Sequence, residues 1–148
     1  MKGIEKNMSK VAVVYWSGTG NTEAMAVSVA DGVKKAGGEA VVLTAGEFDS
    51  SMIASFDEIA FGCPAMGAEE LEEDEFEPMF SACESELNGK KIALFGSYGW
   101  GDGEWMRTWE ERCVSLGAVI ACESVIANET PDDEAAAKCV ELGEKLAG

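Results

Sequence analysis

The fold is decided by residues 10–22, which read KVAVVYWSGTGNT. The run from Val11 to Trp16 is continuously apolar or aromatic, which predicts a strand that is buried on both faces. Two glycines and four small polar residues follow it, and the residues after them repeat with helical spacing. A loop of this kind predicts an anion site, because backbone N–H groups and the positive end of the helix dipole meet there.

The predicted anion is held by neutral groups, since residues 17–22 contain no lysine, arginine or histidine. A dinucleotide fingerprint is excluded because Glu23 occupies its third glycine position, and a Walker A motif because no lysine follows the glycines. The alternative is a helix-capping turn without a ligand, since Ser, Thr and Asn cap helices for local reasons. The candidate donors are the backbone amides and side chains of Ser17, Gly18, Thr19, Gly20, Asn21 and Thr22.

Strands and helices are expected to alternate along the rest of the chain. Further apolar runs predict strands at residues 39–45, 56–62, 90–96 and 118–127. Helices are predicted at 21–36, 75–86, 106–116 and after the start signal Thr130-Pro131-Asp132, while residues 50–55 allow only a turn or two. The last helix is expected to bury Ala136, Cys139, Val140, Gly143 and Ala147. The pattern predicts one α/β domain over residues 8–148, a doubly wound three-layer sandwich around a five-stranded parallel sheet.

Composition narrows the classes of function. The 148 residues include 28 acidic and 11 basic ones, and the net charge of −17 argues against nucleic acid and anionic membranes as partners. No segment is apolar over the ~20 residues that a membrane span needs. The polar start MKGIEKNMSK does not resemble a secretory leader, so we expect a cytoplasmic protein in which residues 1–7 extend beyond the fold.

The five cysteines show no metal-ligand spacing, and the chain has no histidine, so no metal site is expected. We interpret these cysteines as small buried hydrophobes in a reducing compartment.

Two further loops at the same predicted sheet edge have the composition of a site for a flat ring. Residues 63–67 read CPAMG and residues 97–103 read SYGWGDG. Glycines on both sides of Trp100 let backbone amides approach a planar ligand, and Met66 is able to cover the other face of an aromatic ring. Taken singly, each residue is also a common packing anchor. Together with residues 17–22, they favour a planar aromatic mononucleotide.

These stretches resemble one known family. VVYWSGTGNTEAMA, GCPAMGAEELEEDEFEP and KKIALFGSYGWGDGEWMRTWEERCVSLG are similar to the flavodoxins, particularly the short-chain clostridial type, and the likeness covers residues 10–146. The resemblance implies the strand order 2-1-3-4-5 and a non-covalently bound FMN. Its phosphate would lie on residues 17–22, with Met66 on the inner face of the ring and Trp100 on the outer face.

The resemblance also implies roles for the neighbouring residues. Glu69 would accept from N3–H of the ring, and the amides around Gly99–Gly101 would reach the pyrimidine edge. Gly67 matches a glycine whose peptide turns over on reduction to offer its carbonyl to N5–H. The remaining cofactor-binding positions are Ala65, Ala68, Ser97, Tyr98, Asp102 and Asn128.

The chain departs from the family pattern at two positions. Pro64 stands where many relatives carry serine, which removes one phosphate hydroxyl. Ala68 stands where many carry aspartate, in a turn whose type II form needs positive φ at that residue. We hypothesise that Ala68 disfavours this type II form by up to ~1 kcal/mol and eases one-electron reduction.

The function implied is low-potential one-electron transfer between oxidoreductases, and we expect no catalytic residues. Carboxylates of residues 69–77 and of Asp102 and Glu104 would lower the second reduction potential and dock transient partners with basic faces. We expect the protein to be a monomer. The alternative is a quinone-reductase-like flavin enzyme of the same fold, and a response-regulator module would need paired carboxylates where Tyr15 and Trp16 stand.

Overall fold

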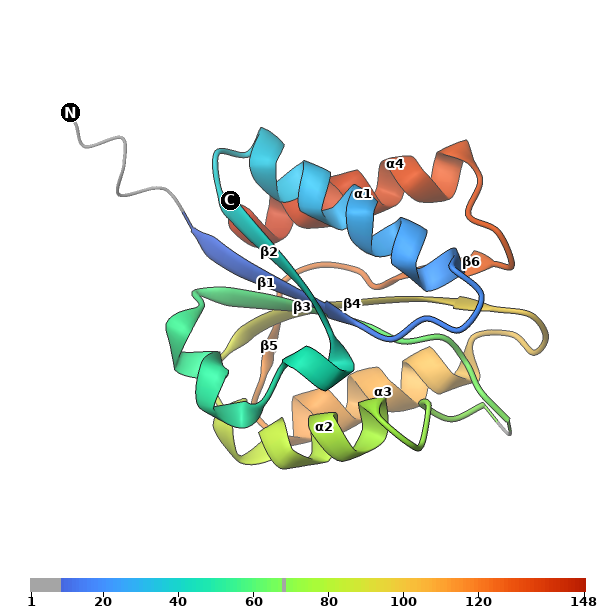
Figure 1. Ribbon diagram of the computed structural model, residues 1–148, viewed down its shortest axis with the longest axis horizontal. Coiled ribbons are helices and arrows are strands. Elements are labelled where there is room, and N and C mark those ends of the chain that lie inside the picture. The colour runs from blue at the N-terminus through green and yellow to red at the C-terminus, as the bar shows by residue number, and fades with distance from the viewer. Residues whose placement is uncertain (1–8, 68) are drawn as a thin grey trace.

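The computed structural model describes residues 9–67 and 69–148 (Figure 1). The extension predicted at residues 1–7 and the hypothesis on Ala68 concern positions outside the described residues. The strands are β1 (Lys10–Tyr15), β2 (Glu39–Thr44), β3 (Glu58–Gly62), β4 (Lys91–Tyr98), β5 (Val119–Ile120) and β6 (Val125–Asn128). The helices are α1 (Asn21–Lys35), α2 (Phe76–Cys83), α3 (Glu104–Ser115) and α4 (Asp133–Ala147), with short 3₁₀ turns at Ala45–Glu47, Ser50–Ser55 and Glu84–Glu86.

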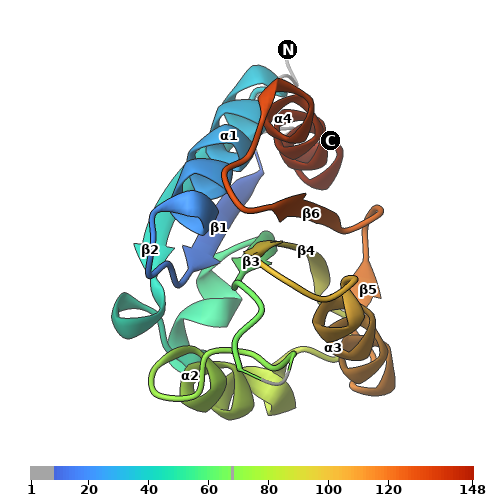
Figure 2. The same ribbon diagram turned by 90° about the vertical axis from the view of Figure 1, so that its right-hand side faces the viewer.

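The described strands form one parallel sheet in the order β2-β1-β3-β4-β5, and β6 also pairs with β4. Helices α1 and α4 cover one face of the sheet and α2 and α3 cover the other (Figures 1 and 2). The doubly wound α/β prediction and its strand order are therefore confirmed. Because every strand runs the same way, the loops after β1, β3 and β4 lie at one edge, which faces the viewer in Figure 2.

The sheet separates two hydrophobic cores. Along β1, Ala12 and Val14 belong to the core under α2 and α3, whereas Val11 and Val13 belong to the core under α1 and α4. All four side chains are fully buried, as the continuous apolar run predicts. β2 differs, because it lies at the edge of the sheet and leaves Val42 exposed. Its run EAVVLT is nearly as apolar as that of β1, so the sequence alone does not distinguish an edge strand from a central one.

The strand predicted at residues 118–127 is interrupted. β5 pairs with the beginning of β4 and β6 with its end, and residues 121–124 separate them. The polar pair Glu123-Ser124 lies in this interruption, and the Ser124 hydroxyl donates to Glu110 Oε2 of α3 at 2.5 Å. The hydrogen bond from Ser124 to helix α3 favours a break in the strand. The apolar residues on either side of the break still pair with β4.

Helices α1 and α4 pack closely through two glycines. A Cβ added to Gly32 would lie 1.9 Å from the Val140 carbonyl oxygen, and one added to Gly143 would lie 2.1 Å from the Val29 carbonyl oxygen. The face that α4 buries includes Ala135, Leu142 and Leu146 beside the predicted Cys139, Gly143 and Ala147, while Ala136 and Val140 are only half-buried. The predicted face is therefore correct for three residues and misplaced by one position for two.

We expect Gly143→Ala to lower the free energy of unfolding by about 2–3 kcal/mol, because the added methyl group forces the two helix backbones apart. Helix propensity alone favours alanine by about 1 kcal/mol, so the sign of the change is diagnostic. Urea unfolding followed by circular dichroism measures it, with the exposed substitution Glu141→Ala as the control. An unchanged or raised stability would contradict the close packing.

The cysteines behave as expected. All five are free, and four of them are fully buried, while Cys122 is half-buried. Burial raises the pKa of the Cys83 thiol to about 11 and those of Cys113 and Cys139 to about 12. Each of these three thiols therefore stays protonated and unreactive near neutral pH.

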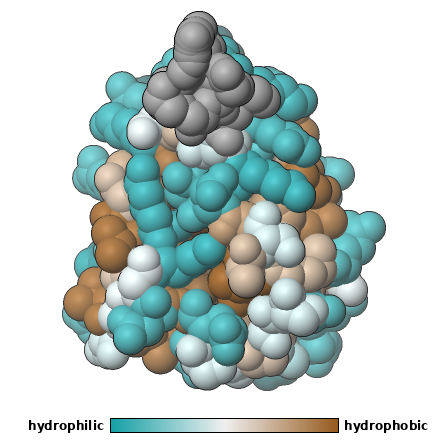
Figure 3. Space-filling view, turned by 90° about the vertical axis from the view of Figure 1, so that its left-hand side faces the viewer, coloured by the Kyte–Doolittle hydropathy of each residue, from teal (hydrophilic) through white to brown (hydrophobic). Residues whose placement is uncertain are grey.

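No described helix combines the length and apolar character that crossing a membrane requires. The face at the amino-terminal ends of the strands, opposite the loops discussed below, mixes hydrophilic and hydrophobic residues (Figure 3).

Candidate functional site

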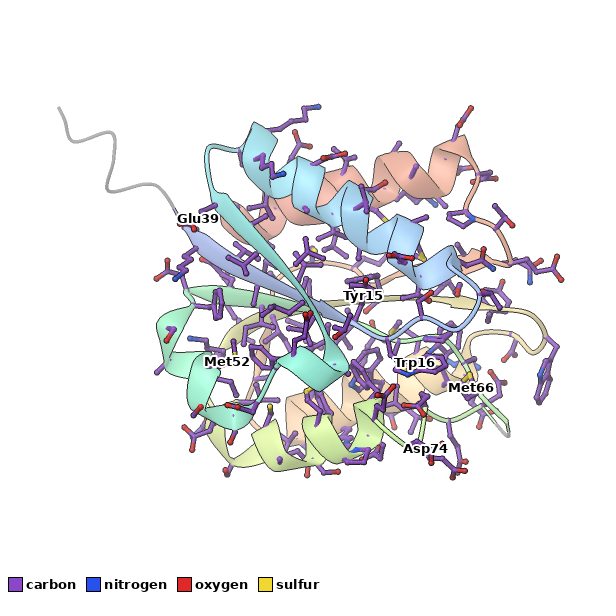
Figure 4. All side chains as sticks on the ribbon, viewed as in Figure 1. Tyr15, Trp16, Glu39, Met52, Met66 and Asp74 are labelled. Carbon is purple, nitrogen blue, oxygen red and sulfur yellow. The ribbon has the colours of Figure 1, made fainter. Side chains whose placement is uncertain are left out.

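A cavity of about 300 Å³ opens at the carboxyl edge of the sheet. It is lined from all three of the loops that the sequence singles out, after β1, after β3 and after β4. Trp16 and Met66 lie at this edge in Figure 4, far from Glu39 at the other end of the sheet. The lining residues are Trp16, Gly18, Thr19, Asn21, Pro64, Ala65, Met66, Ser97, Tyr98, Gly99 and Glu129.

The loop after β1 gathers backbone N–H groups around one point. Gly20 is the residue that precedes α1, and its φ of 95° is a left-handed conformation that glycine adopts without strain. The hydroxyl oxygen of Ser17 accepts from the amides of Gly20 at 3.0 Å and Glu23 at 3.2 Å. The amides of the first helical turn have no acceptor within the helix, so this end of α1 presents donors and a positive dipole to the cavity.

The three loops are joined by buried hydrogen bonds at Ser97. The hydroxyls of Thr22 and Ser97 lie 2.8 Å apart, and the two residues are only 1% and 5% exposed. The backbone carbonyl of Ser97 accepts from the Ala65 amide at 3.0 Å. The start of α1, the end of β4 and the loop after β3 are thus held at fixed relative positions.

The loop after β3 forms a tight hairpin. The amide of Met66 donates to the Glu70 carbonyl at 2.8 Å, and the amide of Glu70 donates to the Met66 carbonyl at 2.9 Å. Gly67 and Glu69 have positive φ values of 50° and 58°. Positive φ is uncommon for a glutamate, so the hairpin stores backbone strain where a functional turn was expected.

Glu69 turns its carboxylate toward the loop after β4. A Cβ on Gly101 would lie 2.8 Å from the carboxylate carbon, so the two loops are in close contact, and the φ of 87° at Gly101 is a conformation that favours glycine. Oε1 of Glu69 is buried and has no hydrogen-bond partner among the described residues. A buried acceptor without a donor is costly, so this oxygen is suited to receive an N–H from a ligand.

The loop after β4 presents an exposed aromatic ring. Trp100 is 62% exposed, and Met66 on the neighbouring hairpin is 37% exposed. Large apolar side chains exposed beside a cavity indicate surfaces that a ligand covers. Asp102 at the end of this loop forms an ion pair with Arg107 at 3.1 Å.

Tyr98 and Asn128, two further predicted site residues, make contacts within the protein. The Tyr98 ring packs against Trp105 with a centroid separation of 5.5 Å. The Asn128 side-chain amide donates to the Tyr98 carbonyl at 3.3 Å, and the Glu129 amide donates to the same oxygen at 2.7 Å. Asn128 therefore positions the end of β4, and the neighbouring Glu129 reaches the cavity instead.

Eight of the predicted residues line the cavity: Gly18, Thr19, Asn21, Ala65, Met66, Ser97, Tyr98 and Gly99. Three lining residues, Trp16, Pro64 and Glu129, are not among the predicted site residues. Trp16 could have been suspected, since it directly precedes the predicted anion loop. Glu129 could not have been suspected, because its positive φ of 59° is not a conformation that a glutamate in the sequence indicates.

Glu72 holds the start of α2 behind the hairpin. Its buried carboxylate accepts from the amides of Asp74, Glu75 and Phe76, each at 2.8 Å. Burial alone raises the pKa of Glu72, but the three amides outweigh it and hold the pKa below its ordinary value of 4.5. The ionised carboxylate therefore stabilises the segment that follows the hairpin.

We expect Glu72→Gln to lower the free energy of unfolding at pH 7 by about 1–3 kcal/mol, because all three amides lose a charged acceptor and at least one of them then faces an NH2 group. Since the folded pKa is lowered, the wild-type advantage is complete above pH 4.5 and is lost as the pH falls through the folded pKa. Urea unfolding between pH 3 and pH 7 tests this, with the exposed Glu73→Gln as the control. A difference that stays constant over this range would refute the assignment.

A parallel sheet of this order, with a glycine-rich anion loop and a cavity for a flat ring at its carboxyl edge, defines a mononucleotide-binding protein of the doubly wound α/β class. The family model described as Flavodoxin matches residues 13–143, and the chain belongs to the flavodoxin family.

Individual relatives agree with this assignment. The chain is 48% identical to the flavodoxin of Megasphaera elsdenii over 137 residues, which cover 93% of this chain and 98% of that protein. It is 45% identical to the flavodoxin of Clostridium beijerinckii over 135 residues, covering 91% and 97%. The solution structure of two-electron reduced Megasphaera elsdenii flavodoxin superimposes with a TM-score of 0.86 at 49% identity, covering 93% and 98%.

The predicted resemblance, the FMN cofactor and the function of electron carrier are therefore confirmed, and the reductase alternative is not favoured. The described residues fit FMN. The anion loop supplies N–H and hydroxyl donors for a phosphate, and the unpartnered Oε1 of Glu69 supplies an acceptor for a ring N–H. Bound FMN supplies the one-electron chemistry, and the chain holds and tunes it.

Proposed function

We propose that the three loops divide the binding of FMN among them. Residues 17–22 hold the phosphate, Met66 and Trp100 cover the two faces of the ring, and Glu69 accepts from its pyrimidine edge. The observation that carries this proposal is the buried Oε1 of Glu69, which has no hydrogen-bond partner among the described residues and lies beside Gly101 of the loop after β4. The neighbouring amides of Met66 and Glu70 donate to each other's carbonyl groups and not to this oxygen.

The same residues tune the carrier toward low potential. Carboxylate oxygens of Glu69, Asp102 and Glu104 lie within 4.8 Å of one another next to the ring site. Their negative field disfavours a further negative charge nearby, and the effect is stronger where Met66 and Trp100 exclude water. The cavity residues in the described part of the chain include no histidine, cysteine or lysine, which supports a carrier rather than an enzyme.

The acidic rim also suits transient docking of redox partners with basic faces. Glu70 and Glu73 are exposed beside the hairpin, and the net charge of −17 steers basic proteins while keeping copies of this chain apart. We accordingly propose a monomer that comprises one domain over residues 8–148. Its five free cysteines support a reducing compartment, the cytoplasm.

We expect the purified protein to be yellow with FMN and to be reduced in two separate one-electron steps. Glu69→Gln should raise the second potential by about 20–60 mV, because about 59 mV corresponds to ~1.4 kcal/mol and one nearby charge supplies part or all of that. Potentiometric titration followed by the visible spectrum measures both steps. Glu39→Gln, at the opposite end of the sheet, should leave them unchanged (Figure 4). A colourless protein that takes up no FMN would end the proposal.

Docking through the acidic rim predicts a dependence on ionic strength. Electron transfer to a basic acceptor protein should slow as salt rises from 10 to 200 mM, and Glu70→Lys/Glu73→Lys should slow it roughly tenfold at low salt. Stopped-flow absorbance measures the rate. Glu39→Lys is the control, because it changes the net charge by as much as each rim substitution but lies far from the rim. If it slows electron transfer as much per substituted residue, the total charge alone steers the partner.

A further inference from the structure

Trp16 lies between the anion loop and the segment that leads into α2. Its backbone amide continues the pairing of β1 with β3, donating to the Gly62 carbonyl at 3.0 Å. Its indole is half-buried, packs against the core under α2 and α3, and lines the cavity together with Met66 (Figure 4). Indole Nε1 donates to Glu75 Oε1 at 2.8 Å, and Glu75 directly precedes α2.

Gly18 of the anion loop rests on this indole. A Cβ added to Gly18 would lie 3.0 Å from Cη2 and 3.2 Å from Cζ3 of Trp16. The φ of Gly18 is not among the positive values, so its backbone does not itself demand glycine. Gly20 is the opposite case, since its φ is 95° and an added Cβ would meet nothing within 4 Å. The two glycines of the loop therefore differ: Gly20 is favoured by its backbone conformation, whereas a methyl group on Gly18 would press against the indole.

The indole is not free to move aside. Glu75 fixes Nε1, and the amide of Glu75 is itself fixed by the Glu72 carboxylate at 2.8 Å. The same carboxylate holds the amide of Phe76, whose side chain is fully buried. A continuous series of contacts thus runs from the anion loop through Trp16 and Glu75 to the core under α2.

We propose that Trp16 and Glu75 act together as positioning residues for the phosphate of the cofactor. The indole supports the loop from below at Gly18 and sets the direction of the amides that follow, while Glu75 locks the indole in place. The effect is confined to the phosphate end of the site, so the pair determines preference for a phosphorylated flavin over the unphosphorylated one. The proposal rests on the assignment of the phosphate to residues 17–22.

The test compares FMN with riboflavin, which lacks the phosphate. Dissociation constants for both are measured on the full-length apoprotein by quenching of flavin fluorescence. Glu75→Leu should weaken FMN binding roughly three- to tenfold and leave riboflavin binding unchanged, because it removes one hydrogen bond to a charged acceptor. Glu75→Gln keeps an oxygen acceptor and should restore the FMN affinity. Glu73→Leu removes a nearby exposed carboxylate without a hydrogen bond among the described residues and serves as the control.

A double-mutant cycle tests the contact with Gly18. Gly18→Ala should weaken FMN binding about tenfold in the wild-type background, where the methyl group meets a fixed ring. In the Trp16→Leu background the same change should cost less than about twofold, because the ring is gone. The Glu75 variants alter only an exposed side chain, so the proposal stays testable even where the Trp16 variant folds poorly.

The outcomes separate this proposal from the assignment on which it rests. A wild-type protein that binds riboflavin as tightly as FMN would overturn the phosphate site itself. A wild-type protein that prefers FMN, with variants that keep the same preference or weaken both flavins equally, would overturn only the role of Trp16 and Glu75. The role of Trp16 would also be overturned if Gly18→Ala weakened FMN binding equally in the wild-type and Trp16→Leu backgrounds.

Discussion

The inner strand β1 has helices over both of its faces, so every side chain from Val11 to Val14 is excluded from water. A strand in that position needs parallel neighbours whose connections pass over the sheet, and these connections return each loop to the same edge. Thr22 and Ser97 are 75 residues apart in the chain, yet their hydroxyls share a buried hydrogen bond there. The site exists because burial of the central strands forces its loops together.

Close approach at that edge depends on positions without a side chain. A Cβ on Gly96 would lie 2.2 Å from the Cys63 carbonyl oxygen, which also accepts from Trp105 Nε1 at 3.1 Å. The loop after β3 is therefore seated directly against β4 before it turns into the hairpin. The exposed Met66 and Trp100 are carried on rigid supports, although they themselves lie at the surface. Rigid supports beneath exposed contacts suit a protein that must hold a cofactor and admit transient partners.

The two ends of the site differ in electrostatic character. The end at residues 17–22, to which we assign the phosphate, offers hydroxyls, amides and a helix dipole and no cationic side chain. The other end gathers the carboxylates of Glu69, Asp102 and Glu104, which oppose added negative charge. The net charge of −17 does not reveal this difference, because it says nothing of where the charged residues lie in the structure. We therefore assign anchoring and tuning of the cofactor to separate ends of the site.

Much of this was determined by the sequence itself. Continuous apolar runs, helical spacing and the loop SGTGNT were enough for the α/β class and the sheet edge, because buried strands and anion loops have local signatures, whereas several site residues followed only from the family resemblance. The sequence did not show that the last strand is interrupted beside Ser124 or that the Trp16 indole lies against Gly18. Each of these depends on which partner a residue meets across the fold. Only the tertiary structure decides such contacts, because they join residues that have no fixed spacing along the chain.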